Sequence, residues 1–524
     1  MATEANKRIW LHVAEVFILG LILTLAATLR LANRADNPGW YSDEGTHIDI
    51  AMNLMEGRAQ SLALTQSTLI VARPPLFHLL LAGVFRVWGA GIATLRGLTG
   101  VLGVLSVCLL YLVTRKAHGP ALALLAAFTL AIYPDAVLYS RLGFSYNLLA
   151  PLALLVCLGL WLYLENTSRA WLALAAVAIG LGAISDVMIL SFVLPFSIVV
   201  SARRWRDLSW SLPLVAAPFG LYIAVMLAVA PQAFLFDLRF IFFSLGTIPL
   251  IAQLPFAVVN LALLLARDYW LAPAIVGLFV LKPRRWGRLN LLLLLLPLFS
   301  LTRTTTGLSG LSFYYLIPLL PFVALGVASL ILYGAPHVLQ TLRDGLADLF
   351  QQWGWGKGGW PQARLLAAIP ALGLFLIIVG PLIASTFLTA AQVQTGFKTA
   401  IEAALIDPAS ARLTAEFINR NTRPDDVVIA SPAVAWLFHT HTADFQQALA
   451  ADGGVTMSFP AGIPAGRFAF DARYTQARFV VVDRIWRNWG APNMPGVADL
   501  MHEAETWPLA FQAGEFAVYR NPAR

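Results

Sequence analysis

The 524-residue chain is 59% hydrophobic and only 12% charged, a composition that excludes an ordinary soluble enzyme. Its formal net charge is +8 at pH 7. The basic residues stand in short loops between apolar runs, so we interpret them as markers of the cytoplasmic side and expect no nucleic-acid partner. Cys108 and Cys157 both lie inside apolar runs, which argues against a disulfide framework or a cysteine metal site.

Apolar runs of roughly twenty residues recur through the first three quarters of the chain, long enough to cross a bilayer core of about 30 Å. They predict a polytopic α-helical membrane protein. Lys7 and Arg8 precede the first run, which extends from about Trp10 to Leu29 and is too long for a signal-peptide core. We therefore expect an uncleaved first span with its N-terminus in the cytoplasm.

Basic loops at Arg115-Lys116, Arg203-Arg204 and Lys282 to Arg285 allow the spans to be paired by parity. This predicts about eleven crossings, with the C-terminus outside. The predicted crossings are residues 10–29, 94–114, 120–139, 146–164, 170–184, 187–201, 209–230, 268–281, 289–302, 313–333 and 365–389.

Three further segments are predicted to lie at the membrane surface. Residues 75–88 suit an interfacial helix, which makes residues 31–91 one long first external loop. Pro231 to Arg267 is predicted as a second external loop, although two spans there and a third short one also satisfy parity. Ala335 to Arg364 is predicted as a cytoplasmic amphipathic stretch, and its Trp353 to Trp360 tract as a surface anchor.

The composition changes at Gln392, where charged residues, Asp-Pro turns and short β-branched runs begin. Val427 to Ala430 and Phe479 to Val482 predict buried strands, and Ser410 to Asn419 predicts a helix. We therefore divide the chain into a transmembrane domain, residues 1–391, and a small α/β domain outside the membrane, residues 392–524.

The stretch from Trp40 to Gly57 is an acidic interruption between apolar segments. Asp43 and Glu44 are adjacent, His47 follows, and the apolar positions after them indicate a short amphipathic helix. A carboxylate at a membrane interface can deprotonate a hydroxyl acceptor or bind a divalent metal ion. The alternative is an Asp that caps the helix, with a solvated Glu beside it.

Two cations are candidates for phosphate binding. Arg73 precedes Pro74-Pro75 in a segment that ends at His78, and the stiff prolines would hold its charge at a fixed point. Arg141 stands at the outer end of a predicted span, where a lipid headgroup is the alternative partner. For Arg73 the alternative is an ordinary structural loop.

Other polar residues at outer ends complete the candidate site. Asp186 lies at a predicted outer turn and either needs a partner there or starts the next helix. Tyr315 is either a phenol donor to phosphate or part of an interfacial aromatic belt. His439 and His441 have strand-like spacing, but no third metal ligand is evident nearby.

Together these pieces resemble the GT-C superfamily of polyprenyl-phosphate-dependent glycosyltransferases. The resemblance is to the branch with the protein O-mannosyltransferases and the lipid A aminoarabinose transferase. Its motifs cover about residues 10–335. They are Asp43-Glu44, Arg73-Pro74-Pro75-Leu76, Arg96 through Tyr111, Tyr139-Ser140-Arg141, Tyr314-Tyr315-Leu316-Ile317-Pro318 and, more loosely, Ala477 to Asp483.

The resemblance implies a hexosyl- or pentosyltransferase that moves a sugar from a polyprenyl phosphate to a lipid, protein or glycan acceptor. Asp43 would be the base, Glu44 would orient it, and Arg73 and Arg141 would neutralise the leaving phosphate. This chain departs from the family at Tyr146-Asn147, where relatives often carry a carboxylate, and at Asp186, where a Lys is frequent.

Two other functions remain open from the sequence. One is a transporter or flippase for lipid-linked sugars, although transporters usually place polar groups near the bilayer midplane. The other is a cell-envelope assembly protein with no catalytic activity. The notable charges of this chain gather at outer ends and in a long loop, which favours the enzyme.

Overall fold

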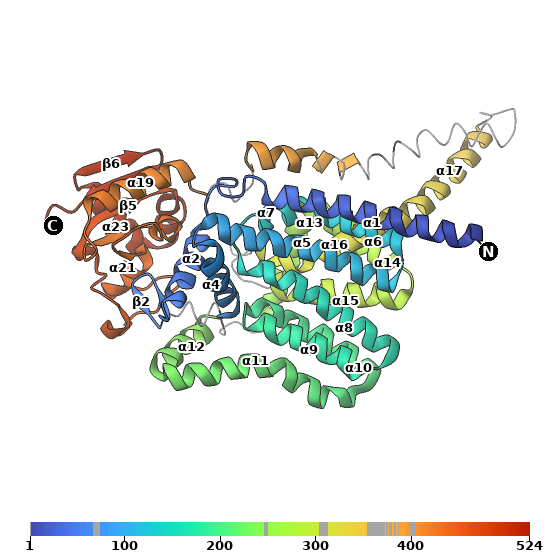
Figure 1. The fold of residues 1–524 in the computed structure, drawn as a ribbon, viewed down its shortest axis with the longest axis horizontal. Coiled ribbons are helices and arrows are strands. Elements are labelled where there is room, and N and C mark those ends of the chain that lie inside the picture. The colour runs from blue at the N-terminus through green and yellow to red at the C-terminus, as the bar shows by residue number, and fades with distance from the viewer. Residues whose placement is uncertain are drawn as a thin grey trace.

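The computed structural model describes residues 2–66, 74–245, 250–302, 313–353 and 404–524, and parts of 373–397. A helical region and a C-terminal region, residues 404–524, lie end to end along the longest axis (Figure 1). The N-terminus and the C-terminus are at opposite ends of the molecule. The elements between them place the candidate site at the junction of the two regions.

Most of the helical region consists of apolar helices. They are α1 (Ala2–Leu31), α2 (Ser42–Met55), α4 (Leu76–Trp88), α5 (Ile92–Ala117), α6 (Pro120–Ile132), α7 (Pro134–Ser140), α8 (Leu149–Asn166), α9 (Arg169–Ala183), α10 (Val193–Arg204), α11 (Leu208–Val229), α12 (Pro231–Leu245), α13 (Leu250–Arg267), α14 (Leu271–Val280), α15 (Arg284–Thr302), α16 (Leu320–Ser329) and α17 (Ala335–Gln352). Short 3-10 helices η1 (Ser145–Leu148), η2 (Val187–Phe192) and η5 (Phe313–Leu319) join some of them.

Within the described residues, five helical segments are long and apolar enough to cross a membrane, or seven if each of two bent helix pairs is one span. The structure therefore does not confirm the predicted count of about eleven. Two predicted crossings fall on α9, with 15 residues, and α14, with 10 residues. Both are shorter than the roughly 20 residues that a full crossing needs. Most of residues 365–389 lies outside the described residues.

The two bent pairs contact each other at their breaks. The chain bends by 59° between α6 and α7 and by 97° between α13 and α14. The ring of Tyr133, at the first break, stacks on Trp270, at the second, with centroids 4.5 Å apart. The Tyr133 hydroxyl also donates a hydrogen bond to Asp268. These contacts join the two breaks, and Arg30 donates to the carbonyl oxygens of Leu130 and Ala131 at the end of α6, as a membrane interior requires of freed backbone groups.

Close packing of small residues joins α14 to α16. A Cβ atom on Gly277 would lie only 1.8 Å from the carbonyl oxygen of Gly326. Without side chains at these positions, the two backbones approach closely, the usual way in which membrane helices gain packing energy. This contact helps to hold the helix that follows Tyr314 and Tyr315 in place.

The C-terminal region contains a five-stranded sheet in the order β4-β3-β5-β7-β6. The strands are β3 (Val427–Ile429), β4 (His441–Ala443), β5 (Ala477–Val482), β6 (Leu509–Ala513) and β7 (Phe516–Arg520). β3 is parallel to β4 and β5, whereas β7 is antiparallel to β5 and β6. Four helices accompany the sheet: α19 (Pro408–Asn421), α20 (Pro432–Ala435), α21 (Phe445–Ala451) and α23 (Pro495–Glu505).

The individual elements predicted in this region are confirmed. β3 and β5 cover the two predicted strands, and both are almost fully buried, which explains their unbroken apolar runs. The predicted helix is α19, which begins two residues earlier because Asp407 caps it. The Asp407 carboxylate accepts a hydrogen bond from the backbone N–H of Ser410 at 2.8 Å.

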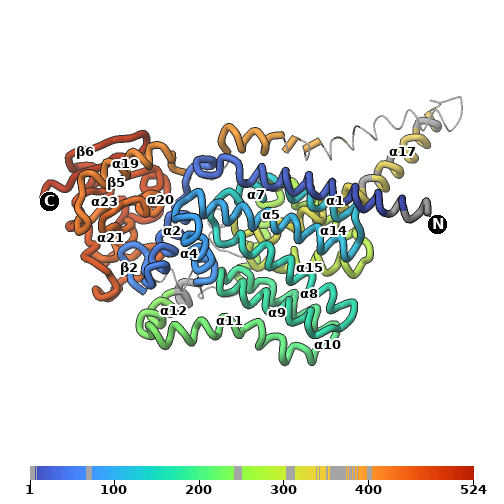
Figure 2. Tube along the Cα trace, viewed as in Figure 1, coloured from blue at the N-terminus to red at the C-terminus, as the bar shows by residue number. Residues whose placement is uncertain are grey.

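The first loop and the C-terminal region share one hydrophobic core. Ile48 of α2 and Phe77 of α4 belong to the same buried cluster as Val428 of β3 and Val480 of β5. Figure 2 shows α20 beside α2. A Cβ atom on Gly45 of α2 would lie 1.7 Å from the carbonyl oxygen of the first residue of α20, so this approach requires glycine.

A buried ion pair adds a second connection between the regions. Arg467 donates to both carboxylate oxygens of Asp237 on α12, at 3.2 and 3.0 Å. It also donates to the carbonyl of Thr65, at the end of a small hairpin formed by β1 (Gln60–Ser61) and β2 (Leu64–Thr65). One guanidinium thus joins α12, the first loop and the C-terminal region.

Candidate active site

A pocket of about 280 Å³ lies where the helical and C-terminal regions meet. We call it the α2 pocket because residues of the first turns of α2 line one side. The lining residues are Ser42, Asp43, Thr46, Tyr146, Tyr314, Tyr315, Pro432, Asp444, Phe445, Gln446, Ser458, Phe459 and Trp489. It has the mixed aromatic and polar lining that is typical of small-molecule sites.

Asp43 lies in the first turn of α2 and is partly exposed toward this pocket. The N-terminal end of a helix carries partial positive charge from its first backbone N–H groups, which attracts polar and negatively charged groups. Asp43 is therefore placed to accept a proton or a hydrogen bond from a molecule in the pocket.

Glu44 points elsewhere and is fully buried. Its carboxylate receives two hydrogen bonds from Arg96 of α5, at 2.7 and 2.6 Å, and both side chains are 0% exposed. The backbone N–H groups of Tyr41 and Gly143 donate to the same carboxylate, at 2.9 and 2.7 Å. These bonds give Glu44 the role of an anchor that fixes the start of α2.

Arg96 extends the same network to the end of α1. Its guanidinium also donates to the carbonyl oxygens of Arg34, Pro38 and Gly39, at 2.9, 2.7 and 2.8 Å. Because a buried charge is costly unless it is paired and hydrogen-bonded, this complete set of partners is what makes the pair tolerable. Asp43 is thus held beside a rigid network.

Three tyrosines of the helical region form one wall of the α2 pocket. The rings of Tyr146 and Tyr314 stack with centroids 5.4 Å apart. Tyr315 meets the Tyr146 ring edge-on at 5.2 Å. Such aromatic contacts hold the three rings in place. The sequence predicted Tyr315 here, and the structure brings it into the same pocket as Asp43.

Asp444 supplies a second carboxylate on the opposite wall. It caps α21 by accepting a hydrogen bond from the backbone N–H of Gln447 at 2.8 Å. Burial raises the pKa of the Asp444 carboxyl to about 6, because the ionised form loses its hydration. Its sequence signal is an Asp followed three residues later by Gln, which marks a helix start rather than a site.

Arg141 is buried and faces backbone groups. It donates to the carbonyl oxygens of Leu29, Asn33 and Asn37, at 2.7, 3.3 and 2.7 Å, near the end of α1. A cation there satisfies carbonyl groups that a helix terminus leaves without partners. This geometry favours a structural role for Arg141 over the phosphate contact predicted from the sequence.

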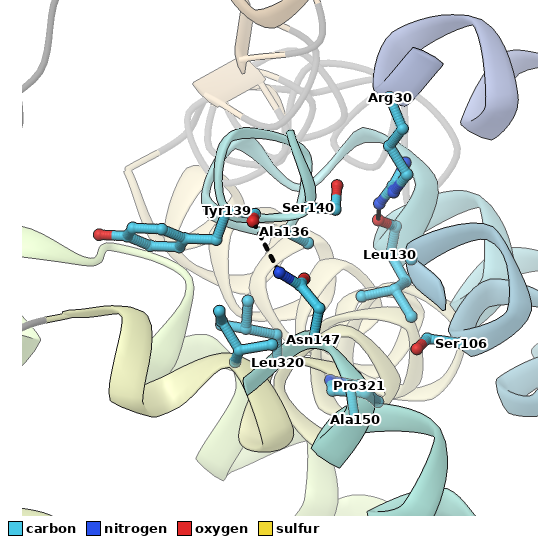
Figure 3. A pocket seen from close by; sticks show the side chains of 12 residues that line it. Arg30, Ser106, Leu130, Ala136, Tyr139, Ser140, Asn147, Ala150, Leu320 and Pro321 are labelled. Carbon is cyan, nitrogen blue, oxygen red and sulfur yellow. Dashed lines mark hydrogen bonds between the residues drawn. The ribbon is translucent and has the colours of Figure 1, made fainter. Parts of the chain in front are cut away.

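Arg30 has a similar position beside a small cavity inside the helical region (Figure 3). It donates to the carbonyl oxygens of Leu130 and Ala131, at 2.9 and 2.8 Å, where α6 ends. The cavity has a volume of about 20 Å³, close to the 10–15 Å³ that one water requires. It is far too small for a sugar, so the α2 pocket is the better candidate.

His47 and His78, the two histidines of the first loop, are in contact. Nδ1 of His47 on α2 lies 2.8 Å from Nε2 of His78 on α4, and both side chains are almost completely buried. One ring nitrogen must carry the proton that the other accepts. The pair joins the two helices beneath the pocket, and neither histidine lines it.

Asp186 caps η2 and connects it to η1. Its carboxylate accepts from the backbone N–H of Met188 at 3.1 Å and from the hydroxyl of Ser145 at 3.4 Å. It does not line the α2 pocket. The alternative interpretation from the sequence, that Asp186 starts the next helix, describes this arrangement.

Arg73 lies outside the described residues. His441 stacks on Phe470 with ring centroids 4.5 Å apart, and the backbone N–H of His439 donates to Asn419. Among the residues that the structure describes, no group of three or more His, Cys, Asp or Glu side chains is arranged to hold a metal ion. The α2 pocket itself has two carboxylates, those of Asp43 and Asp444.

Sequence reasoning overlooked Arg267, at the end of α13. Its guanidinium carbon lies 3.2 Å from the centroid of the Phe313 ring, and Phe313 directly precedes two tyrosines of the pocket wall. The side chain is exposed. An Arg-Asp pair between two apolar runs was a signal in the sequence, since isolated charges at membrane depth commonly mark functional sites.

Comparisons with known protein families and sequences gave one match. A family model described as dolichyl-phosphate-mannose-protein mannosyltransferase matches residues 72–231. A comparison with curated protein sequences found no significant match.

Two solved structures match nearly the whole chain. ArnT from Cupriavidus metallidurans is 13% identical, with a TM-score of 0.59 in the apo state over 99% of each chain. Its complex with undecaprenyl phosphate gives a TM-score of 0.58, over 97% of this chain and 98% of that one. The oligosaccharyltransferase AglB from Archaeoglobus fulgidus, in complex with an inhibitory peptide and a dolichol-phosphate, is 14% identical. Its TM-score is 0.52, over 99% of this chain and 75% of that one.

The Glu44–Arg96 pair generates the first prediction. Glu44→Gln should destabilise the protein by about 3 kcal/mol, because it leaves the Arg96 charge buried without a counter-ion. Thermal unfolding of the purified protein in detergent measures the effect. Glu56→Gln is the matched control at the other end of α2, where Glu56 pairs with Arg58 and is 56% exposed. This control should change stability by less than about 1 kcal/mol. Equal shifts in the two variants would contradict the anchoring role.

Proposed function

We propose that this chain, which has the fold of the GT-C membrane glycosyltransferases, transfers a sugar from a polyprenyl-phosphate donor to an acceptor hydroxyl on the outer face of the cytoplasmic membrane. The observation that carries the proposal is the α2 pocket. It places the Asp43 carboxylate beside a tyrosine wall, at the junction of an apolar helical region and a C-terminal region. A lipid-linked donor needs this combination of a membrane side and an aqueous side.

The structural neighbours support the choice of donor. ArnT was solved with undecaprenyl phosphate and AglB with a dolichol-phosphate, and both share this fold. The matched family model is named for a mannosyltransferase that uses dolichyl phosphate. A polyprenyl phosphate would place its tail among the apolar helices and its phosphate at their outer ends.

In the proposed reaction, Asp43 acts as the general base. It takes the proton of the acceptor hydroxyl while that oxygen forms a bond to the anomeric carbon of the sugar. The bond between the anomeric carbon and the phosphate oxygen breaks, and the phosphate keeps the electron pair.

Charge on the leaving phosphate must be neutralised near the tyrosine wall. We assign this role to Arg267, with Tyr315 as a hydrogen-bond donor, because Phe313 links the Arg267 guanidinium to that wall. Arg73 keeps its sequence-based role as a second cation. Arg141 is assigned instead to the end of α1, where three backbone carbonyls occupy its guanidinium.

Glu44 supports the reaction indirectly in this proposal. It fixes the first turn of α2 through Arg96 and the N–H of Gly143, so that Asp43 keeps one orientation. The proposed mechanism routes no step through a metal ion. Two carboxylates together with a donor phosphate are a ligand set that Mg²⁺ accepts, so Asp43 and Asp444 would be the residues to hold a divalent ion in the α2 pocket.

The proposed topology places the N-terminus in the cytoplasm and the first loop and C-terminal region outside, with residues 1–391 and 392–524 as the two domains. The arrangement of the elements supports it, since the N-terminus and α17 lie at one end and α2 and the sheet at the other (Figure 1). α10 ends in Arg203-Arg204. Positive residues favour the cytoplasmic side.

Asp43→Asn tests the proposed base. It should lower kcat for sugar transfer by about 10²–10⁴-fold, the usual contribution of general base catalysis, without loss of folding. Release of sugar from a polyprenyl-phosphate donor by purified protein measures the rate. Asp425→Asn, which removes an exposed carboxylate in the C-terminal region, is the matched control and should leave the rate unchanged. An unchanged rate in Asp43→Asn would refute the assignment.

Arg267→Ala tests the phosphate contact. Loss of the charge should weaken donor use at least tenfold in kcat/KM, with partial recovery in Arg267→Lys, because a charge-assisted hydrogen bond contributes about 1.5–3 kcal/mol. Arg288→Ala, at an exposed position on α15, is the control. If transfer by Arg267→Ala matched that of the control, the phosphate would have to be bound elsewhere.

Cysteine labelling tests the topology. Ala59→Cys in the first loop and Ala461→Cys in the C-terminal region should react with a membrane-impermeant maleimide in sealed cells, since both positions are exposed. Ala202→Cys, exposed near the end of α10, should react only after permeabilisation. The unsubstituted protein gives the background from Cys108. Labelling of Ala202→Cys in sealed cells would invert the proposed orientation.

A further inference from the structure

A second pocket, of about 230 Å³, lies further along α2 and opens between that helix and the C-terminal region. We call it the side pocket. It is lined by Asp49, Met52, Asn53, Glu56, Arg58, Gln60, Leu62, Ala435, Trp436, Phe438, Thr440, His441, Thr442 and Phe470. It shares no lining residue with the α2 pocket, and the proposed mechanism uses none of its side chains.

The aromatic side chains of the side pocket are held in fixed positions. His441 and Phe470 stack almost in parallel, with ring centroids 4.5 Å apart and an interplanar angle of 3°. The indole N–H of Trp436 donates to the carbonyl of Ala433 at 3.0 Å, and its ring packs against Trp40. Rigid rings offer flat apolar faces at little entropic cost.

The polar side chains are also oriented before any ligand binds. One carboxylate oxygen of Asp49 accepts from the backbone N–H of Leu62 at 2.7 Å, and the other accepts from Asn53 at 3.2 Å. Arg58 donates twice to the side-chain oxygen of Asn53, at 3.1 and 2.9 Å. A carboxylate has about four lone-pair sites, so Asp49 retains acceptor capacity toward the pocket. The two bonds from Arg58 already use both lone pairs of the Asn53 oxygen.

The charges of the side pocket argue against an anionic ligand. Among the described residues that line the side pocket, Arg58 is the one cation, and it already pairs with Glu56 at 2.5 Å. Asp49 adds a further carboxylate to the lining. Burial raises the pKa of Asp49 to about 7, which lets this side chain both donate and accept near neutral pH. A neutral ligand with several hydroxyl groups suits such a lining.

Size and shape narrow the ligand further. The volume lies below the roughly 300–1,000 Å³ of pockets for drug-sized ligands, so it suits a single ring. A pyranose has an apolar face of C–H groups that stacks on an aromatic ring, and a rim of hydroxyl groups that exchange hydrogen bonds with planar carboxylate and amide side chains.

From these observations we propose that the side pocket is a saccharide-binding site that holds one pyranose unit of a glycan acceptor, away from the unit that is modified. Asp43 and Asp49 stand on the same helix, about 9 Å apart along its axis at 1.5 Å per residue. An acceptor made of linked sugar units is long enough to reach both pockets along this helix, so we take a glycan as the acceptor class. The acceptor role rests on the proposed function, whereas saccharide binding does not.

Direct binding tests the site without any requirement for catalysis. Saturation-transfer NMR on the purified full-length protein, with a panel of methyl pyranosides and their neutral trisaccharides, should detect binding. Phe470→Ala and Gln60→Ala should weaken the best binder at least tenfold. Phe511→Ala on β6 and Gln476→Ala before β5 are the matched controls, and they should bind like the unsubstituted protein. Thermal unfolding confirms that every variant is folded.

Kinetics then separate this proposal from the proposed function. With a glycan acceptor, the two side-pocket variants should raise the acceptor KM at least tenfold and leave kcat unchanged. Asp43→Asn should keep saccharide binding while it loses transfer. Absence of binding by every saccharide, binding that survives both side-pocket variants, or preferential binding of a peptide in the pocket would overturn the saccharide site. Normal transfer by Asp43→Asn would instead overturn the proposed function and leave the binding result standing.

Discussion

The arrangement of the candidate site depends on one buried ion pair, between Glu44 and Arg96. Two charges removed from water are stable only when further hydrogen bonds complete their coordination, and here backbone groups from three segments do so. The pair is therefore stable only when the end of α1, the start of α2 and the turn at Gly143 come together. This fixes the position of Asp43, because it is the neighbour of Glu44 in the first turn.

Two other buried arginines of the helical region also hold backbone segments together through their guanidinium groups. Arg30 and Arg141 donate to backbone carbonyls where α6 and α1 end. In a membrane protein a helix can stop short only if its terminal carbonyls find partners inside the protein. These arginines are thus part of the backbone architecture, which explains why a cation at an outer end of a span is not automatically a ligand for phosphate. Arg267, which is exposed and lies over an aromatic ring, differs from them in this respect.

The sequence predicted what local pattern and composition determine: the helix at α2, the strands β3 and β5, and a tyrosine in the pocket wall. The family resemblance implied that Glu44 orients Asp43, but the residues alone did not show how, because the ion pair of Glu44 with Arg96, far along the chain, is a tertiary contact. The predicted number of crossings is not confirmed for a related reason. Apolar length does not reveal the bends between α6 and α7 and between α13 and α14, since the stacking of Tyr133 on Trp270 that joins the two bends is a tertiary contact. The sequence around Asp444 is that of a helix cap, and Asp444 does cap α21. Its place in the pocket depends on the tertiary fold, which the local sequence does not reveal.

The approach of Gly45 to the start of α20 also has a consequence for biosynthesis. One wall of the α2 pocket is made by residues near the beginning of the chain, and another by residues of the C-terminal region, which are translated much later. The membrane helices can insert while translation continues, but the cavity around Asp43 closes only after the terminal sheet has folded against α2. A nascent chain in the membrane is thus a scaffold without a pocket. Completion of the pocket is therefore delayed relative to insertion of the first helices.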